Sequence, residues 1–212
     1  ATAAAGMTFA ANGYVVSGGT LSLAGAENLL AVNPGIEARI NSVVSGSNGF
    51  IKAGQGTLVL GGANTFTGPV AIGAGRLSIA SDAALGDPSN AVGFSGGSLA
   101  TTATIDLGSR SLTGAASLDV AAGTTLSTFG SVSLSTVMLT NTGTLALNGF
   151  GTTVGNISAT AGNGTARVEG SLDFGASGRT VTVDAGGTLE LAGSLTSGAI
   201  IDKAGDGTLF LS

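Results

Sequence analysis

The sequence contains no cysteine, no histidine and no tryptophan, and charged residues make up only 9% of its 212 positions. Without cysteine or histidine, the chain cannot build most zinc, haem or iron–sulfur sites, a Ser-His-Asp triad or a cysteine nucleophile. These absences exclude most metalloenzymes and redox proteins. The lack of cysteine is compatible with a protein that is exported unfolded, because a premature disulfide would obstruct its passage.

Basic residues are also scarce: seven Lys and Arg stand against twelve Asp and Glu, which gives a net charge of −5 at pH 7. A nucleic-acid-binding protein needs basic residues to neutralise phosphates, so this composition argues against that class. The longest unbroken apolar run, Leu29–Val32, is far shorter than the ~20 residues of a membrane-spanning helix. We therefore expect neither nucleic-acid binding nor direct membrane insertion.

What the chain does contain is glycine, with 38 copies, and hydrophobic residues, which make up 43% of it. That apolar content is too high for a solvated, disordered coil. Glycine interrupts almost every ten-residue window, and each interior glycine costs a helix ~1 kcal/mol relative to alanine. No helix of ordinary length is therefore expected, and only the stretch Asn28 to Val32 could hold one helical turn.

A short phrase recurs along the chain: Gly, usually a small polar residue, Leu, any residue, then Leu or Ile. Clear copies begin at Gly19, Gly56, Gly75, Gly143, Gly187 and Gly207, and looser copies begin at Gly97, Gly123 and Gly170. In each copy, apolar positions alternate with positions that accept many residue types. This is the pattern of a strand with one buried face and one exposed face. Most copies lie about 20 residues apart, which favours the coils of a β-solenoid over the ~40-residue blades of a propeller. The phrase therefore predicts an all-β parallel β-helix (β-solenoid) of about ten coils.

Further strands are expected at 36–40, 70–72, 132–134, 137–139, 166–169 and 180–183. In the first of these, Glu37 and Arg39 alternate with apolar residues, so both charges should point outward. Sparse charge fits a solenoid, because stacked coils place like residues above one another and a ladder of like charges repels itself. Uncharged Thr, Ser and Asn can instead form hydrogen bonds along such a ladder.

One window is more specific than the periodicity: residues 52–68 read KAGQGTLVLGGANTFTG and continue to Gly75-Arg76-Leu77. This window closely resembles the autotransporter-associated β-strand repeat, also called the passenger-associated transport repeat. The family reads roughly K-x-G-x-G-T-L-x-L-x-G-x-N-T-[YF]-T-G, then a strand, then G-x-L. The matching positions are Lys52, Gly54, Gly56, Thr57, Leu58, Leu60, Gly62, Asn64, Thr65, Phe66, Thr67, Gly68, Gly75 and Leu77. We assign a complete repeat to residues 52–80.

A second copy of the repeat begins at Ile201 and stops at Ser212. Its matching positions are Lys203, Gly205, Gly207, Thr208, Leu209 and Leu211. The Asn-Thr-aromatic-Thr-Gly half is missing, and the start of the chain has neither an initiator Met nor a basic segment. We therefore interpret residues 1–212 as a single β-helix segment of a longer passenger, in which 201–212 is the start of a truncated copy.

The resemblance implies a right-handed parallel β-helix in the passenger of a bacterial protein secreted by the type V route. Such passengers cross the outer membrane through a C-terminal translocator barrel of the same polypeptide, which would be a partner of this segment. They are displayed on the cell surface or secreted, and virulence adhesins are among them. The resemblance implies no cofactor.

The alternative function is a carbohydrate-active enzyme, a lyase or glycosidase, with a cleft on the loops of the helix. Such enzymes use pairs of carboxylates, and Asp82 and Asp87 are one candidate pair, although both also suit turns. The densest charge cluster comprises Arg167, Glu169, Asp173, Arg179 and Asp184. The cluster is equally well explained as ordinary solvated charges at the ends of the stacked rows of side chains. The single Tyr and the absence of Trp weigh against stacking on sugar rings, so we predict no enzymatic activity.

Residues 120–166 carry no charge and are dominated by Thr, Ser, Gly and Asn. They form either a flat polar face for adhesion and self-association or an ordinary solenoid surface. Gly205-Asp206-Gly207 has the wrong glycine spacing for a calcium nonapeptide, and no cluster supplies the oxygens that calcium needs. We predict a non-enzymatic passenger segment that acts as a stalk and adhesive scaffold and aids export. Its predicted partners are a host-surface polymer or like copies of the chain.

Overall fold

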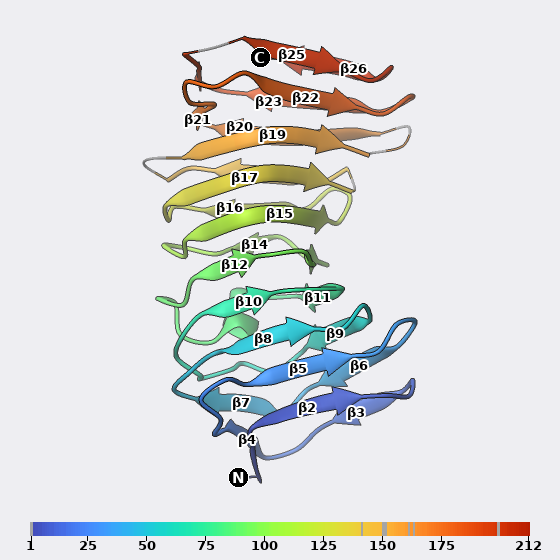
Figure 1. Ribbon diagram of the computed structural model, residues 1–212, viewed down its shortest axis with the longest axis vertical. Helices are drawn as coiled ribbons and strands as arrows, with labels where there is room; N and C mark the ends of the chain where they lie inside the picture. Colours follow the sequence, from blue (N-terminus) through green and yellow to red (C-terminus); the bar gives the residue numbers. More distant parts are fainter. Residues whose placement is uncertain (1, 141, 150–151, 161, 163, 199) are drawn as a thin grey trace.

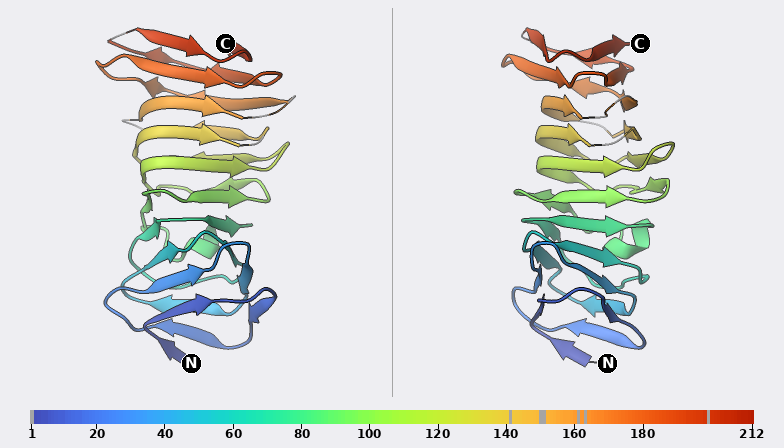
Figure 2. Two further views of the ribbon diagram at one scale, coloured as in Figure 1. Left: turned by 45° about the vertical axis from the view of Figure 1, so that its right-hand side comes forward. Right: turned by 90° about the vertical axis from the view of Figure 1, so that its right-hand side faces the viewer.

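In the computed structural model, which describes residues 2–140, 142–149, 152–160, 162, 164–198 and 200–212, the chain winds as a parallel β-solenoid (Figures 1 and 2). The front strands of Figure 1 run left to right, and the chain returns behind them as it rises from the N-terminus, so the winding is right-handed. One coil takes between 19 residues, where Thr57 pairs with Arg76, and 24 residues, where Tyr14 pairs with Ala38. The predicted fold is confirmed.

The coils have three sides, named A, B and C in chain order. Side A holds β2 (Gly6–Phe9), β5 (Leu29–Val32), β8 (Phe50–Ala53), β10 (Val70–Ile72), β12 (Val92–Phe94), the first halves of β15 (Leu112–Val120), β17 (Val132–Leu139) and β19 (Thr153–Ala159), then β21 (Leu172–Asp173) and β24 (Leu195–Thr196). Side B holds β3 (Tyr14–Val16), β6 (Glu37–Ile40), β9 (Thr57–Leu60), β11 (Arg76–Ile79), β13 (Ser98–Thr101), the second halves of β15, β17 and β19, then β22 (Arg179–Val183) and β25 (Ile201–Ala204).

Side C is interrupted. Its strands are β1 (Thr2–Ala4), β4 (Thr20–Leu23) and β7 (Val43–Gly46), then β14 (Ile105–Asp106), β16 (Thr125–Thr128), β18 (Thr144–Leu147), β20 (Thr165–Gly170), β23 (Thr188–Ala192) and β26 (Thr208–Leu211). Between β7 and β14, two coils have no regular strand on this side. One of them carries an extended segment at 64–67, and the next carries η1 (Asp82–Leu85), a single turn of 3₁₀ helix.

The core is a set of apolar columns inside the solenoid. In one column Leu58, Leu77, Leu99, Leu118 and Leu139 lie directly above one another, and each is buried. Fully burying one such side chain contributes ~1.5–3 kcal/mol. Because the apolar position of the phrase enters this column at every coil, the repeat in the sequence becomes a continuous core in the structure.

Most of the predicted strands are present. The range 70–72 is β10, and the range 36–40 contains β6, in which Ala38 and Ile40 are buried and Glu37 and Arg39 are exposed. The ranges 132–134 and 137–139 form one strand, β17, because sides A and B merge in the coils of β15 to β19. The ranges 166–169 and 180–183 lie in β20 and β22.

The helical turn expected within Asn28 to Val32 is wrong. Residues 29–32 form β5, which pairs with β2 below it and β8 above it. Leu30 and Val32 point into the core with no exposed surface, so the pairing with neighbouring coils outweighs the weak local preference.

The recurring phrase changes sides along the chain. Its copy after Gly19 forms β4 on side C, the copies after Gly56, Gly75 and Gly97 form strands of side B, and from Gly123 onward the clear copies return to side C. The irregular intervals between copies follow from these shifts. The phrase therefore specifies a glycine corner followed by a strand, and it does not specify which side that strand occupies.

Gly75 tests this geometry because it stands at a corner with a φ of 64°. A Cβ atom there would lie 2.4 Å from the carbonyl oxygens of Gly54 and Gly56, in the coil below. We expect Gly75→Ala to lower the free energy of unfolding by more than about 2 kcal/mol, measured by denaturant titration of the β circular dichroism signal. Gly73→Ala is the matched control, since its nearest contact is 3.4 Å, and equal losses in the two variants would contradict the prediction.

Candidate functional site

Lys52, the first residue of the repeat, lies buried at the corner between sides A and B with no exposed surface. Its Nζ donates hydrogen bonds to the carbonyl oxygens of Ala53 and Gly54, each at 2.8 Å, and of Ala74 at 3.0 Å. Ala74 belongs to the next coil, so the ammonium group joins two coils. Burial lowers the pKa of Lys52 to about 8, because desolvation disfavours the charged form.

Asn64 fills the interruption on side C. Its Oδ1 accepts a hydrogen bond from the backbone N–H of Val44 at 2.8 Å, and its Nδ2 donates to the carbonyl oxygen of Ala84 at 2.7 Å. Val44 lies in the coil below and Ala84 in the coil above. The side-chain amide thus takes the place of a peptide group in the ladder between coils, and Asn28 and Asn90 make similar buried contacts with backbone carbonyls.

The aromatic residue of the repeat, Phe66, has no exposed surface and packs edge-on against Phe50, with ring centroids 5.3 Å apart. Thr65 and Thr67, on either side of it, point to solvent. The other matched positions are corner glycines, as at Gly54, Gly56, Gly62, Gly68 and Gly75, or strand residues, as at Thr57, Leu58, Leu60 and Leu77. The repeat motif therefore serves to join coils, and it forms no cavity for a ligand inside the solenoid.

The second, partial copy reproduces part of this geometry at another corner. Lys203 Nζ donates to the carbonyl oxygen of Gly205, as Lys52 does to Gly54, and the φ angles of the two glycines are 74° and 70°. Here, however, the phrase passes from side B (β25) to side C (β26), where the first copy passes from side A to side B. Gly207, Thr208, Leu209 and Leu211 begin and form β26, which pairs with β23.

Arg110 is a buried cation that sequence reasoning missed. Its guanidinium group has no exposed surface and contacts Asp82 twice, with Nε 2.5 Å from Oδ1 and one terminal nitrogen 3.0 Å from Oδ2. It also donates to the backbone carbonyls of Gly86 at 2.8 Å and Asp87 at 2.5 Å. Arg110 thus satisfies the carbonyl groups at the end of η1, and no motif in the sequence marks it out.

The candidate acid pair has local roles. Both carboxylate oxygens of Asp82 contact Arg110. Asp87 Oδ1 accepts hydrogen bonds from the hydroxyl group of Ser89 at 2.6 Å and from its backbone N–H at 2.9 Å, and these bonds lower the pKa of Asp87. The structure uses Asp82 to neutralise a buried cation and Asp87 to shape a turn.

The predicted charge cluster is divided among different sides. Arg167 and Glu169 lie on β20 and pair at 2.9 Å, and Arg167 also contacts Glu190 of β23 at 2.6 Å. Glu190, which the sequence did not single out, has a pKa lowered first by the hydroxyl group of Ser212 and then by Arg167. Asp173 instead accepts a hydrogen bond from the backbone of Gly175 on side A. Arg179 donates to the carbonyl oxygen of Phe174, and Asp184 follows β22 at the corner of sides B and C.

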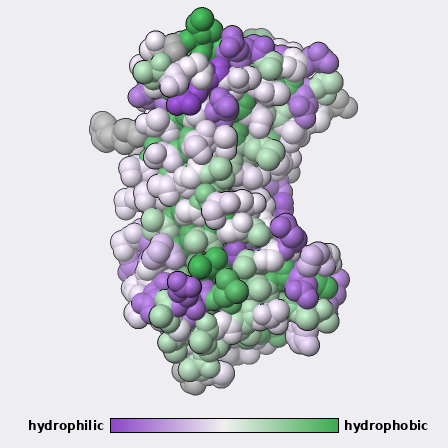
Figure 3. All heavy atoms as spheres, viewed as in Figure 1, coloured by the Kyte–Doolittle hydropathy of each residue, from purple (hydrophilic) through white to green (hydrophobic). Residues whose placement is uncertain are grey.

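The neutral residues 120–166 form a belt around two coils, and we call it the neutral belt. It includes β16, β17, β18 and β19, and residues 141, 150–151, 161 and 163 lie outside the described part. Figure 3 shows mostly pale side chains of intermediate hydropathy across the middle of the front side, with strongly hydrophilic side chains at the upper end and in the lower third. The belt therefore presents uncharged groups on all three sides of the solenoid, and the large side chains of Phe129 and Met138 are exposed among them.

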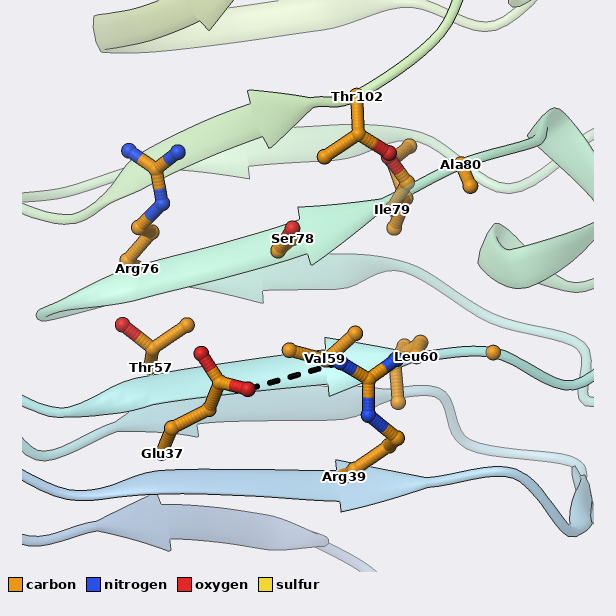
Figure 4. Close-up of a pocket in the computed structure, with 11 residues that line it drawn as sticks. Glu37, Arg39, Thr57, Val59, Leu60, Arg76, Ser78, Ile79, Ala80 and Thr102 are labelled. Atoms are coloured by element: carbon orange, nitrogen blue, oxygen red, sulfur yellow. Dashed lines mark hydrogen bonds and ion pairs between the residues drawn. The ribbon is translucent and has the colours of Figure 1, made fainter.

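A groove of about 390 Å³ lies on the outer surface of side B, across β6, β9 and β11 (Figure 4). Glu37 and Arg39 stand at one end, where they pair at 3.6 Å, and Arg76 stands at the other end. Among the described residues no group of three or more acidic side chains is placed to hold a metal ion. Nor does any helix there have the length and apolar character needed to cross a membrane.

The fold and these contacts define a parallel β-solenoid whose buried polar residues join successive coils. Two comparisons identify the kind of protein that it resembles. Residues 50–79 match the family model described as passenger-associated-transport-repeat. The chain is also 43% identical over 137 residues to the protein named "Adhesin BmaC autotransporter" from Brucella suis biovar 1 (strain 1330), a match that covers 61% of this chain and 4% of that adhesin.

No solved structure is a significant match to the chain. The repeat match and the adhesin relative together confirm the predicted resemblance to an autotransporter passenger. Because the chain spans only 4% of the length of that relative, the match concerns a segment of passenger and not a whole protein.

Arg110 provides a test of the buried contacts. Replacing it with Met leaves Asp82 and the carbonyl groups of η1 without their partner, so we expect Arg110→Met to lower the free energy of unfolding by ~3–5 kcal/mol. Arg167→Met is the control: its side chain is 37% exposed, and surface pairs contribute ~0–1 kcal/mol. Equal stabilities of the two variants in denaturant titrations would contradict the structural role given to Arg110.

Lys52 provides a test by pH. Its pKa is about 8 in the folded chain against 10.5 for a free lysine, so between these values the unfolded chain binds more protons at this position. The stability of the wild type relative to Lys52→Met should therefore rise by up to about 3 kcal/mol between pH 8 and pH 10.5. Denaturant titrations at several pH values measure this difference, with Lys203→Met as the control for an exposed lysine. A difference that stays constant over this range would refute the prediction.

Proposed function

We propose that this chain is a non-enzymatic segment of an autotransporter passenger, displayed at a bacterial surface or secreted. In this role the solenoid acts as a stalk and as a scaffold for adhesion or self-association. The observation that carries the proposal is the passenger repeat at 50–79, whose Lys52 and Asn64 join coils of a continuous solenoid. The adhesin name of the relative supports the adhesive part.

The contacts of the carboxylates support a non-enzymatic role. Asp82 is paired with Arg110, and Arg167 lies between Glu169 and Glu190. A glycosidase needs two carboxyl groups facing a common space, ~5–10 Å apart. Asp82 and Asp87 line a common hollow of about 380 Å³. Both oxygens of Asp82 contact Arg110, however, and Asp87 shapes a turn with Ser89, so their contacts favour structural roles over the lyase or glycosidase alternative.

The proposed contact surface is the neutral belt. Its outward positions stack in register: Ser133 lies beside Thr153, and Thr136 beside Asn156. Hydroxyl and amide groups in such rows can form hydrogen bonds with a facing surface without burying charge. Each bond contributes only ~1 kcal/mol, so adhesion depends on many copies acting together.

The proposed partners are a host-surface polymer and like copies of this chain. We further propose that a C-terminal translocator barrel of the parent polypeptide receives this segment during export, and that the closing of successive coils outside the cell aids that export. The side-chain bridges of the repeat support this idea, because each of them stabilises a coil only once the neighbouring coil is in place.

Self-association can be tested with beads coated with the purified chain. The net charge of −5 opposes close approach, so we expect the beads to clump more at moderate salt than at low salt, because salt screens the repulsion. Thr136→Asp combined with Asn156→Asp places two negative charges side by side in the belt and should abolish the clumping.

The control variant places the same two charges elsewhere. Ser22→Asp combined with Ser45→Asp alters two neighbouring positions on side C, in the pair β4–β7 and outside the belt. This variant should still clump as the wild type does. It should need somewhat more salt, because its two added charges increase the repulsion that salt must screen. Equal loss in both variants, or no clumping of the wild type at any salt concentration, would remove the adhesive role of the belt and leave only the stalk.

A further inference from the structure

The outer surface of side A carries an apolar patch in its lower coils, across β5, β8, β10 and β12. The outward positions of these strands are Leu29, Ala31, Ile51, Ala53, Ala71 and Gly93, and we call them the side A patch. None of them is charged, and Leu29 is 46% exposed. Figure 3 shows strongly hydrophobic side chains gathered over β5 and β8 on the front side. Contiguous apolar surface of this kind marks contact sites.

Side-chain size falls along the side A patch from its lower to its upper coils. Pairing between the strands places one outward residue at each level, in the order Leu29, Ile51, Ala71 and Gly93. Successive levels lie ~4.8 Å apart. The two lower levels project branched side chains, whereas the two upper levels carry a methyl group and no side chain. The patch is therefore raised over its lower half and recessed over its upper half.

A raised half beside a recessed half fits a second copy of the same patch. A two-fold axis parallel to the strands, halfway between the levels of Ile51 and Ala71, brings two patches face to face with the solenoids in opposite directions. Leu29 of one copy then faces Gly93 of the other, and Ile51 faces Ala71. Parallel solenoids would instead place Leu29 on Leu29 and Gly93 on Gly93, which leaves a void that loses packing contacts.

Charge favours the same orientation. Each copy has a net charge of −5, so two copies approach most easily where acids are absent. Glu27 is exposed at the corner of sides C and A, beside Ile51 and Ala71. In the antiparallel pair the two Glu27 side chains lie about three levels apart, ~14 Å, which exceeds the Debye length of ~8 Å at physiological salt. In a parallel pair they would lie at the same level.

The size of the face sets the strength of the contact. The uncharged positions Gly6 below the patch and Thr113 above it extend the row to six levels. Six levels and a strand of four residues cover roughly 400 Å² per copy, about half of the ~800 Å² per partner that a stable interface buries. The face therefore supports a weak pair, which gains where many copies are held close together on a surface.

We propose that the side A patch is a contact between two copies of this chain, packed antiparallel with Leu29 of each copy over Gly93 of the other and Ile51 over Ala71. This contact goes beyond the proposed function, because apolar packing holds it and it lies in other coils than the neutral belt. It also fixes the direction in which two solenoids pair, which rows of hydroxyl groups do not.

The first test is sedimentation velocity of the full chain at increasing concentration and moderate salt. We expect the sedimentation coefficient of the wild type to rise as pairs form. Gly93→Leu adds apolar surface but faces it with Leu29 of the other copy, so it should weaken pairing roughly tenfold. Gly93 can accept a side chain, since the nearest atom to an added Cβ is Thr113 Oγ1 at 3.7 Å. Leu29→Ala combined with Gly93→Leu exchanges the large and small residues and should restore pairing.

Two further variants separate this contact from general effects of charge. Leu29→Asp should abolish pairing, because it places a carboxylate in the apolar contact. Val15→Asp is the matched control, since Val15 is an apolar residue of side B that is 54% exposed, and it should pair as the wild type does. The belt variant, Thr136→Asp with Asn156→Asp, should also pair normally, and loss of pairing in it would assign the contact to the belt and overturn the proposal.

The orientation can be read with single cysteines, because the chain has none of its own. A mixture of Leu29→Cys copies with Gly93→Cys copies should be joined by a short bismaleimide crosslinker. Either variant alone should give little product, since like positions lie about three levels apart, ~14 Å. Efficient crosslinking of Leu29→Cys to itself would show parallel packing and contradict the proposal.

Three other results would overturn the proposal. They are a wild type that stays monomeric at every concentration, tighter pairing by Gly93→Leu, which would show that only apolar area matters, and equal losses in Leu29→Asp and Val15→Asp. Failure of the exchanged variant to restore pairing would also count against the predicted register. The circular dichroism spectrum of each variant establishes that it is folded.

Discussion

The whole structure depends on one constraint: the backbone groups of each coil find their hydrogen-bond partners in the coils above and below. Buried peptide groups without a partner are costly, so this pairing must continue through corners and interruptions as well as along strands. Where strands meet, the parallel ladders provide it. At the corner after β8 the ammonium group of Lys52 provides it, on the interrupted side C the amide of Asn64 does, and at the end of η1 the guanidinium group of Arg110 does.

Outward side chains contribute little to holding the coils together, so the outer surface is under fewer constraints. Since inward Leu residues and corner groups hold the coils together, the outward positions of each strand can vary without loss of the fold. The same register that stacks Leu58 on Leu77 places Arg39, Val59 and Ser78 in a row outside, and it places Thr136 beside Asn156 in the neutral belt. An elongated scaffold with a tolerant surface is the arrangement that an adhesive passenger needs, and different contacts can then occupy different coils.

The sequence predicted the fold well because the apolar alternation is local and repeated in each coil. Glu37 and Arg39 point outward as their alternation indicates, and β10 has the predicted bounds. The sequence could not show that Asn28–Val32 is extended, because that outcome depends on pairing with β2 and β8, 22 or 23 residues away. It also gave no sign that Arg110 is buried, since its partner Asp82 is 28 residues distant. The structure divides the grouping of Arg167, Glu169, Asp173, Arg179 and Asp184, because neighbours in sequence lie on different sides of a coil.

The central claim is that buried side chains replace backbone partners between coils, and hydrogen exchange at Val44 tests it most directly. Its N–H donates to Asn64 Oδ1, so Asn64→Leu should make this amide exchange much faster while amides of β9 on side B, such as that of Leu58, keep their wild-type rates. Faster exchange confined to Val44 and its neighbours in the adjacent coils would agree with the account. An unchanged exchange rate at Val44 in a folded Asn64→Leu variant would contradict it.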